Sequence, residues 1–193
     1  MQIASHNSWS YLPPKKWWMK LLSFTAKCQD VDIMTQYKDY NVRCFDLRVR
    51  FDSKGRVQIV HGMIVYDIEL IDFFYQLTLL NLHKDVYIRV ILDVRTKSQY
   101  TYNQIVNFRN FCADLEDRFK DIKFYCGQSL YKRVVEYEFK CKGVTCVEKY
   151  ASVQQPKIID DWYPRLYAAI VNQTLNKYDD NAQFLMVDFV NYL

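Results

Sequence analysis

Short apolar runs with strand character alternate with amphipathic helical stretches along most of this chain. Side chains alternate between two faces of a strand, so Asp46 and Arg48 share one face of the run 42–50. The expected strands are residues 1–5, 42–50, 57–61, 86–95, 133–139, 145–150 and 184–190. The expected helices are residues 13–22, 32–38, 69–83, 102–119 and 160–177, with Asp30 or Asp32 as the N-cap of the second. Strands that alternate with helices favour parallel β/α units.

One domain is expected over residues 1–193, because no linker, repeat or low-complexity tract interrupts this pattern. A regular (β/α)8 barrel takes about 250 residues, with about 200 near its lower limit. We therefore predict an α/β fold, a compact or irregular TIM-type (β/α)8 barrel with one or more crossover helices missing. The gap at residues 140–144 is too short for a crossover helix, so the irregularity is expected there. A doubly wound open sheet is the alternative.

The charge distribution bears on the kind of partner. The net charge of +4 arises from interspersed acidic and basic residues, without the basic stripe of a nucleic-acid-binding protein. A weakly positive field suits anionic partners such as phosphate headgroups.

The cysteines and the apolar runs bear on the compartment. No C-x-x-C pair, secretory signal or apolar run of transmembrane length is present, so reduced thiols are expected. We expect a soluble and, by default, cytoplasmic chain, with an exported form left open. The six cysteines are Cys28, Cys44, Cys112, Cys126, Cys141 and Cys146.

Polar side chains gather where the expected strands end. In a β/α barrel the C-terminal strand ends converge on the face where catalysis occurs. The first and last strands of a closed barrel are neighbours, so Asp188 is expected beside His6 despite their separation in sequence. The residues at these ends are His6, Asn7, Asp46, Arg48, His61, Asp93, Arg95, Glu148, Tyr150 and Asp188.

Four stretches of the sequence, each with one or more of these strand-end residues, resemble a known family. The stretches ASHNSWSYL, QYKDYNVRCFDLRVRF, VQIVHG and FLMVDFVN occur in that order between residues 4 and 191. Together they resemble the X-region of phosphatidylinositol-specific phospholipases C, although each alone is a weak signal. Residues 99–140 match only in general pattern.

The resemblance implies a catalytic role for four side chains. His6 would be the general base that takes a proton from the inositol 2-hydroxyl, and Asp188 would orient it. His61 would be the general acid that protonates the departing glycerol oxygen, and Arg48 would contact the phosphate. Two histidines with pKa near ~6.5 can divide acid and base roles at neutral pH. The implied first product is a cyclic inositol phosphate.

The resemblance also bears on metal dependence. Asn7 and Asp46 fit the ligand pattern of calcium-dependent members, but Arg48 and Arg95 stand where further acids would be. A fixed guanidinium repels a dication and can replace its charge, so no cofactor is expected. Metal-independent bacterial members more often have Asp where this chain has Asn7.

The remaining strand-end residues have less specific signals. Glu148 and Tyr150 resemble the inositol-binding carboxylate and the aromatic ring on which the sugar stacks, or they are ordinary rim residues. Asp93 is a candidate phosphate-site residue. Asp46 and Arg48 could also form a structural ion pair.

The stretch LPPKKWWMKLL, which follows the first strand, combines cations with interfacial aromatics. We expect at least one of Trp17 and Trp18 to pack into the core. The alternative is contact with a membrane surface through these two residues, which such a pattern also suits.

Two other functions compete with a phosphodiesterase acting on phosphatidylinositol or a related inositol phosphodiester. One is a glycerophosphodiester phosphodiesterase, whose paired strand-two acids and H-D motif are missing here. The other is a weakly active module that binds phospholipid or sugar phosphate, which the unusual Asn7 keeps open. The oligomeric state is left open by the sequence.

Overall fold

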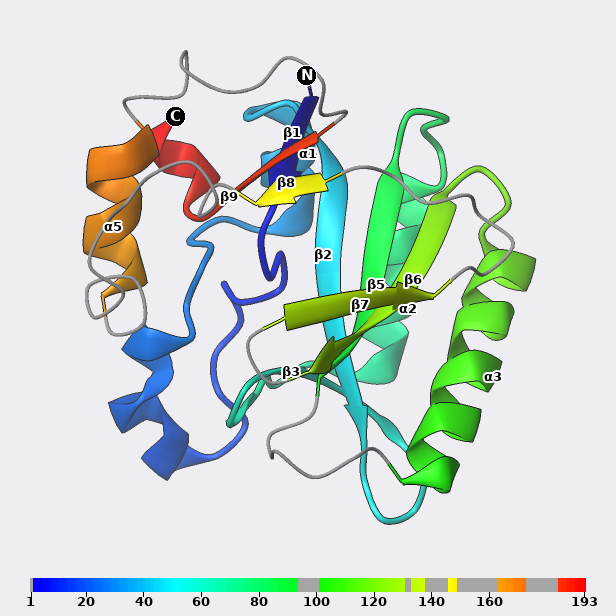
Figure 1. Cartoon of the computed structure of the whole chain (residues 1–193). Coiled ribbons are helices and arrows are strands. Elements are labelled where there is room, and N and C mark those ends of the chain that lie inside the picture. Colours follow the sequence, from blue (N-terminus) through cyan, green and yellow to red (C-terminus); the bar gives the residue numbers. More distant parts are fainter. Residues whose placement is uncertain (1, 94–100, 131–132, 138–145, 149–162, 173–183) are drawn as a thin grey trace.

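The computed structural model describes residues 2–93, 101–130, 133–137, 146–148, 163–172 and 184–193, with only the backbone described at 125–130, 133–137, 146–148 and 171. The main sheet runs in the order β7-β6-β5-β2-β1-β9-β8. Its strands are β1 (Gln2–Ser5), β2 (Val42–Phe51), β5 (Tyr87–Asp93), β6 (Lys123–Leu130), β7 (Arg133–Tyr137), β8 (Cys146–Glu148) and β9 (Phe184–Val187). Figure 1 shows these strands between helices on both sides.

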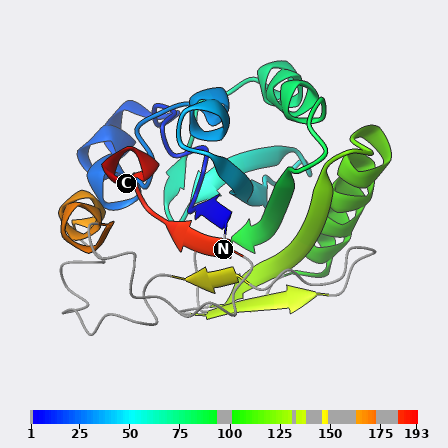
Figure 2. The same ribbon diagram turned by 90° about the horizontal axis from the view of Figure 1, so that it is seen from above.

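Six of the seven strands are parallel, and β7 alone runs antiparallel to its neighbour β6. The sheet curves as a β/α barrel does, and Figure 2 shows helices following its convex side. Within the described ranges, no pairing joins β7 to β8, so the predicted closed barrel is not observed. The parallel β/α character is confirmed, and closure is not.

Two strands differ from the prediction in direction or existence. β3 (Val57–His61) was expected as a barrel strand, but it pairs antiparallel with the end of β2 and then with β4 (Ile64–Val65). The turn between β2 and β3 is too short for the crossover that a parallel pair would need. β6 was not expected, because Gly127, Gln128 and Ser129 interrupt its apolar run.

Helices of the described ranges cover the convex face of the sheet (Figure 2). They are α1 (Ile33–Lys38), α2 (Leu70–Leu80) and α3 (Tyr102–Arg118). The larger apolar core lies between these helices and the sheet, with Phe45, Leu47 and Phe108 among its buried members. A smaller cluster of Ala4, Cys44, Phe184 and Met186 forms where the first, second and last strands meet.

The helix expected at 13–22 is shorter than predicted. Only Trp17–Leu21 (η1) is helical, followed by Ser23–Thr25 (η2), and both are 3-10 helices. Pro14 forms a bridge with Tyr66, and Lys15 N donates to Val65 O at 2.8 Å. The start of this segment is therefore fixed beside β4.

The exposure of Trp17 and Trp18 also differs from the prediction that at least one of them is buried. Trp17 is 78% exposed and Trp18 is 41% exposed, whereas Trp9 is fully buried. Trp9 lies against Phe73 and donates its Nε1 hydrogen to Gln76. The two exposed rings are available to a partner surface.

The C-terminal part contributes α5 (Pro164–Val171), the strand β9 and the short 3-10 helix η5 (Val190–Tyr192). Figure 1 shows α5 on the side of the sheet opposite α3. None of the helices in the described ranges is long and apolar enough to cross a membrane.

Candidate active site

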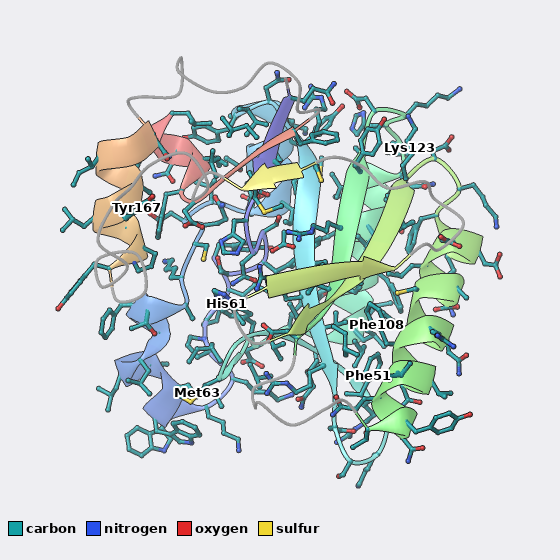
Figure 3. All side chains as sticks on the ribbon, in the orientation of Figure 1. Phe51, His61, Met63, Phe108, Lys123 and Tyr167 are labelled. Carbon is teal, nitrogen blue, oxygen red and sulfur yellow. The ribbon has the colours of Figure 1, made fainter. Side chains whose placement is uncertain are left out.

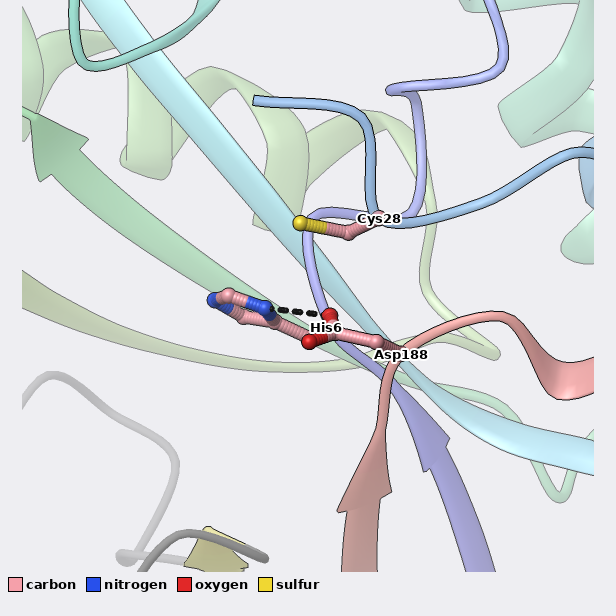
Figure 4. A group of neighbouring side chains, drawn as sticks. All are labelled: His6, Cys28 and Asp188. Carbon is pink, nitrogen blue, oxygen red and sulfur yellow. Dashed lines mark hydrogen bonds and ion pairs between the residues drawn. The ribbon is translucent and has the colours of Figure 1, made fainter. Parts of the chain in front are cut away.

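The pairing of β1 with β9 brings the two ends of the chain together. Ser5 pairs with Val187, so the next residues, His6 and Asp188, emerge side by side. His6 Nδ1 lies 2.7 Å from Asp188 Oδ1 (Figure 4). The structure therefore places Asp188 beside His6, as the topology predicted.

Arg48 connects this pair to the second strand. Its Nη2 lies 2.8 Å from His6 Nε2, and its Nε donates to Asp46 Oδ2 at 2.8 Å. A guanidinium nitrogen can only donate, so Nε2 is the acceptor and the ring proton resides on Nδ1. His6 is therefore held as the neutral tautomer that donates to Asp188, the form required of a base at Nε2.

Asp46 is a buried anion at the base of the site. Its Oδ2 also accepts the backbone N–H of Asn7 at 3.0 Å, and its Oδ1 lies 3.6 Å from Arg89 Nη1. Burial alone would raise the pKa of Asp46, but Arg48 and Arg89 hold it well below its ordinary value. Asp46 and Arg48 therefore form an ion pair whatever their role toward a substrate. Arg89 was not singled out in the sequence, since it lies within an apolar strand.

The pKa of His6 reflects several opposing charges. Burial and Arg48 lower it, whereas the carboxylates of Asp188 and Asp46 raise it, and the net shift is upward. This balance stabilises the imidazolium that forms when His6 accepts a proton.

His61 ends β3 with its ring near that of His6. The two ring centroids are 5.6 Å apart, with the planes at 85°. His61 Nδ1 lies 2.9 Å from the carbonyl oxygen of Ala26 and donates to it, since that oxygen can only accept. Burial, Arg48 and His6 lower the pKa of His61 to about 4. His61 is therefore neutral at neutral pH, with Nε2 unprotonated.

The Ala26 carbonyl is a shared acceptor beneath His61. It also accepts from Asn7 Nδ2 at 3.2 Å and from Tyr66 Oη at 2.9 Å. Asn7 has a φ of 43°, in the left-handed region that asparagine tolerates better than most residues. Its buried side chain thus supports the position of His61 from within the protein. The role of Ala26 was missed, because a main-chain carbonyl leaves no signal in the sequence.

Asp93 and Arg50 fix the turn that follows His61. Asp93 Oδ2 accepts the Gly62 N–H at 3.0 Å. Arg50 donates to the carbonyl oxygens of both Asp93 and Gly62. Gly62 has a φ of 55°, so glycine suits this turn. Asp93 therefore positions the end of β3 in this structure.

Gln29 ties the first and last strands together beneath the site. Its Nε2 donates to the carbonyl oxygens of His6 and Val187, at 3.1 and 3.0 Å. Its Oε1 accepts from Val190 N at 3.1 Å. This contribution was also missed, because Gln29 lies in a segment without a strand or helix.

Three predicted substrate-binding residues cannot be placed. Arg95 and Tyr150 lie outside the described residues, and Glu148 is described only by its backbone at the end of β8. His83, in contrast, stacks on Tyr37 with ring centroids 4.4 Å apart and takes no part in the site.

Comparison with solved structures identifies proteins of similar fold. A double mutant of the phosphatidylinositol-specific phospholipase C from Staphylococcus aureus matches with a TM-score of 0.60 and 16% identity, over 97% of this chain and 84% of that one. A pentafluoro-Phe variant of the same enzyme matches with a TM-score of 0.57 and 15% identity, over 97% and 85% of the two chains. No protein-family model and no curated protein matches. At this identity the likeness concerns the fold alone: this chain has an α/β fold similar to that of a phosphatidylinositol-specific phospholipase C.

Proposed function

We propose that this protein is a phosphodiesterase that cleaves phosphatidylinositol or a related inositol phosphodiester. The main support is the contact of His6 with both Asp188 and Arg48, at 2.7 and 2.8 Å, with the His61 ring facing it. Two imidazoles and a guanidinium in contact match what in-line phosphodiester cleavage requires.

In the proposed reaction, His6 Nε2 accepts the proton of the inositol 2-hydroxyl. The oxygen then attacks phosphorus, and the bond from phosphorus to the glycerol oxygen breaks. His61 donates a proton to that leaving oxygen, which gives diacylglycerol and a cyclic inositol phosphate. Arg48, which contacts His6 in the structure, would turn to the phosphate and release Nε2.

His61 must gain a proton before it can act as an acid. Its lowered pKa, about 4, belongs to the protein without substrate. A bound phosphodiester anion beside His61 would raise the pKa and stabilise the imidazolium. Substrate binding would thus prepare the acid for the reaction.

We also propose that no metal takes part. Arg48 and Arg89 already neutralise Asp46, and the Asn7 amide nitrogen donates to Ala26 O and Tyr66 Oη. A dication at this position would face two guanidinium groups.

The lipid surface is the proposed location of the substrate. One of the similar solved structures was determined in work on the membrane binding of the Staphylococcus aureus enzyme. In this chain the exposed Trp17 and Trp18 lie on η1, a segment tied to β4 beside the His61 hairpin. Contact through these rings would bring the site to the lipid headgroups.

The experiment compares turnover of phosphatidylinositol and glycerophosphoinositol with and without a chelator. His6→Ala and His61→Ala should each lose about 10²–10⁴-fold of the activity, while His83→Ala serves as the matched control. Formation of a cyclic product that resists the chelator supports the proposal. Turnover that a chelator abolishes would indicate a metal-dependent glycerophosphodiester phosphodiesterase, and binding without turnover would indicate a binding module.

A further inference from the structure

Cys28 adds a sulfur atom to the pair formed by His6 and Asp188. An imidazole nitrogen, the Cys28 sulfur and a carboxylate oxygen lie within 4.8 Å of one another, and all three residues are buried. Figure 4 shows the three side chains arriving from separate segments of the chain. We propose that His6, Cys28 and Asp188 bind a thiophilic divalent cation, Zn²⁺, and that the bound ion blocks the site.

The backbone around the sulfur is held in place before any ion binds. Cys28 N donates to Ser10 Oγ at 2.9 Å, and Cys28 O accepts from Phe189 N at 2.5 Å. The second bond ties Cys28 directly to the residue after Asp188. Asn172 Nδ2 donates to Asp188 O at 2.9 Å, which fixes the carboxylate's segment as well.

The distances suit zinc after small side-chain movements. Zn²⁺ takes ligands at about 2.3 Å for sulfur and about 2.0–2.2 Å for nitrogen and oxygen, usually in a tetrahedron. Such ligand atoms lie about 3–4 Å apart, so the sulfur needs to approach slightly and the 2.7 Å contact between His6 and Asp188 needs to open. Water can complete the coordination, because His61 Nδ1 carries the proton that it donates to Ala26 O.

The charges favour zinc over calcium. A thiolate and a carboxylate together balance a dication, so the ion and its three ligands are neutral as a group beside Arg48. Calcium and magnesium prefer oxygen ligands, and a site with sulfur and nitrogen ligands selects against them. Without a metal, burial raises the pKa of the Cys28 thiol, and the ion would displace that proton.

The proton balance of binding follows from the hydrogen bonds. The Cys28 thiol releases one proton to solvent. The proton on His6 Nδ1 moves to Nε2 so that Nδ1 can bind the ion, and Arg48 then loses its acceptor on His6. His6 can no longer take a proton from a substrate. This inhibitory consequence rests on the proposed function, whereas the binding site itself does not.

Zinc binding is tested by competition with a chromophoric chelator, using Zn²⁺ and Ca²⁺ as probes. Cys28→Ser should weaken zinc binding at least about tenfold. Cys112→Ser, at a cysteine buried in α3, should leave this binding unchanged. Calcium should not compete. Equal zinc binding by wild type and Cys28→Ser would refute the site.

A second measurement needs no variant. The chain has three histidines, so imidazole ¹H–¹⁵N spectra of the wild type are simple. Zinc should shift the ring-nitrogen signals of His6 and leave those of His83 in place. Unchanged His6 signals at saturating zinc would overturn the proposal even if Cys28→Ser does not fold.

Activity separates this proposal from the proposed function. Zinc should lower phosphatidylinositol turnover in the wild type, and a chelator should restore it. Absence of turnover in the metal-free protein would count against the proposed function and leave the binding results intact. Full turnover with zinc bound at His6 would refute the inhibition.

Discussion

The position of one proton on His6 determines whether this side chain can act as a base. Arg48 occupies Nε2 and Asp188 occupies Nδ1, so the tautomer is fixed from both sides. His61 is fixed from one side only, by the Ala26 carbonyl. The two histidines therefore differ in charge preference although they are neighbours: the pKa of His6 is raised, and that of His61 is lowered to about 4.

These opposite shifts predict the pH dependence of catalysis. The productive form has a neutral His6 and a protonated His61. Because His6 has the higher pKa, this form is a small fraction of the molecules in which the two histidines carry one proton between them. The state with one proton is lost below the pKa of His61, about 4, where both rings are protonated, and above the raised pKa of His6, where neither is. We expect a bell-shaped profile of kcat/KM between these limits.

Asp188→Asn assigns the alkaline limb of that profile. Loss of the carboxylate removes a charge that raises the pKa of His6, so the limb should move to lower pH. The rate should also fall by about 10²–10⁴-fold, because the tautomer is no longer held. Asp30→Asn, whose carboxylate instead contacts Lys27 and Arg165, is the control. An unmoved alkaline limb would show that His6 is not the group that titrates there.

His61 also predicts a loss of stability in acid. Its pKa is about 4 in the folded protein against 6.5 for an ordinary histidine, so the unfolded chain takes up the proton first. Stability should therefore fall as the pH drops from 6.5 to 4, by on the order of 3 kcal/mol. The raised pKa of His6 acts at higher pH, where its stabilisation is lost as the pH rises.

Urea unfolding at pH 6.5 and pH 4.5 measures this effect. In His61→Gln, whose amide can still donate to Ala26 O, the difference between the two pH values should shrink. His83→Gln should keep the difference of the wild type. An equal acid loss in His61→Gln and wild type would contradict the burial of a neutral His61.

At the scale of elements, the N-cap of α1 stabilises a helix that contacts the segment carrying His6. Asp32 Oδ1 accepts the backbone N–H groups of Met34 and Thr35, at 2.9 and 3.0 Å. α1 in turn carries Gln36, whose Nε2 donates to Ser8 O, two residues after His6. The sequence left Asp30 and Asp32 as alternative caps, and the structure selects Asp32.

Asp32→Ala should lower the free energy of unfolding by about 1 kcal/mol, because two helix N–H groups lose their acceptor. Asp30→Ala removes only partly exposed ion pairs with Lys27 and Arg165, so its effect should be smaller. Chemical denaturation of both variants at neutral pH makes the comparison. A larger loss in Asp30→Ala would contradict this assignment of the cap.

The elements also show which features the sequence could predict. Asp188 could be placed beside His6, because the first and last strands are neighbours in a barrel-type strand order, and the structure keeps β1 beside β9. The prediction of β3 as a parallel barrel strand was wrong, although the short turn at Asp52–Gly55 already required an antiparallel pair. Ala26 could not be found, since its contribution comes from a backbone carbonyl whose position depends on the folded loop.

At the scale of the whole molecule, the sheet gathers the site residues, and the exposed apolar side chains of η1 and η2 form a separate surface. The curved parallel sheet collects His6, Arg48 and Asp188 from strand ends that are far apart in sequence. Figure 3 shows His61 near the centre of the view and Met63, in the turn after it, toward the η1 segment. η1 and η2 expose Trp17, Leu21 and Phe24, and the residues just before η1, Pro14 and Lys15, are tied to the end of β4 that follows this turn.

This surface predicts how the protein meets its substrate. Trp17 is 78% exposed, and a ring of this size gains free energy when it enters a membrane interface. Tyr102, which is 80% exposed at the start of α3, is a matched aromatic on the other side of the sheet. Trp17→Ala should weaken binding to phosphatidylinositol-containing vesicles by about tenfold, measured by co-sedimentation.

Tyr102→Ala should bind vesicles as the wild type does, and both variants should turn over soluble glycerophosphoinositol at the wild-type rate. The distinction matters because a catalytic defect would lower turnover of both substrates, whereas a docking defect lowers only that of the lipid. If Trp17→Ala binds vesicles as well as Tyr102→Ala does, the exposed tryptophan on η1 has no part in docking, and the lipid reaches His6 and His61 from another face.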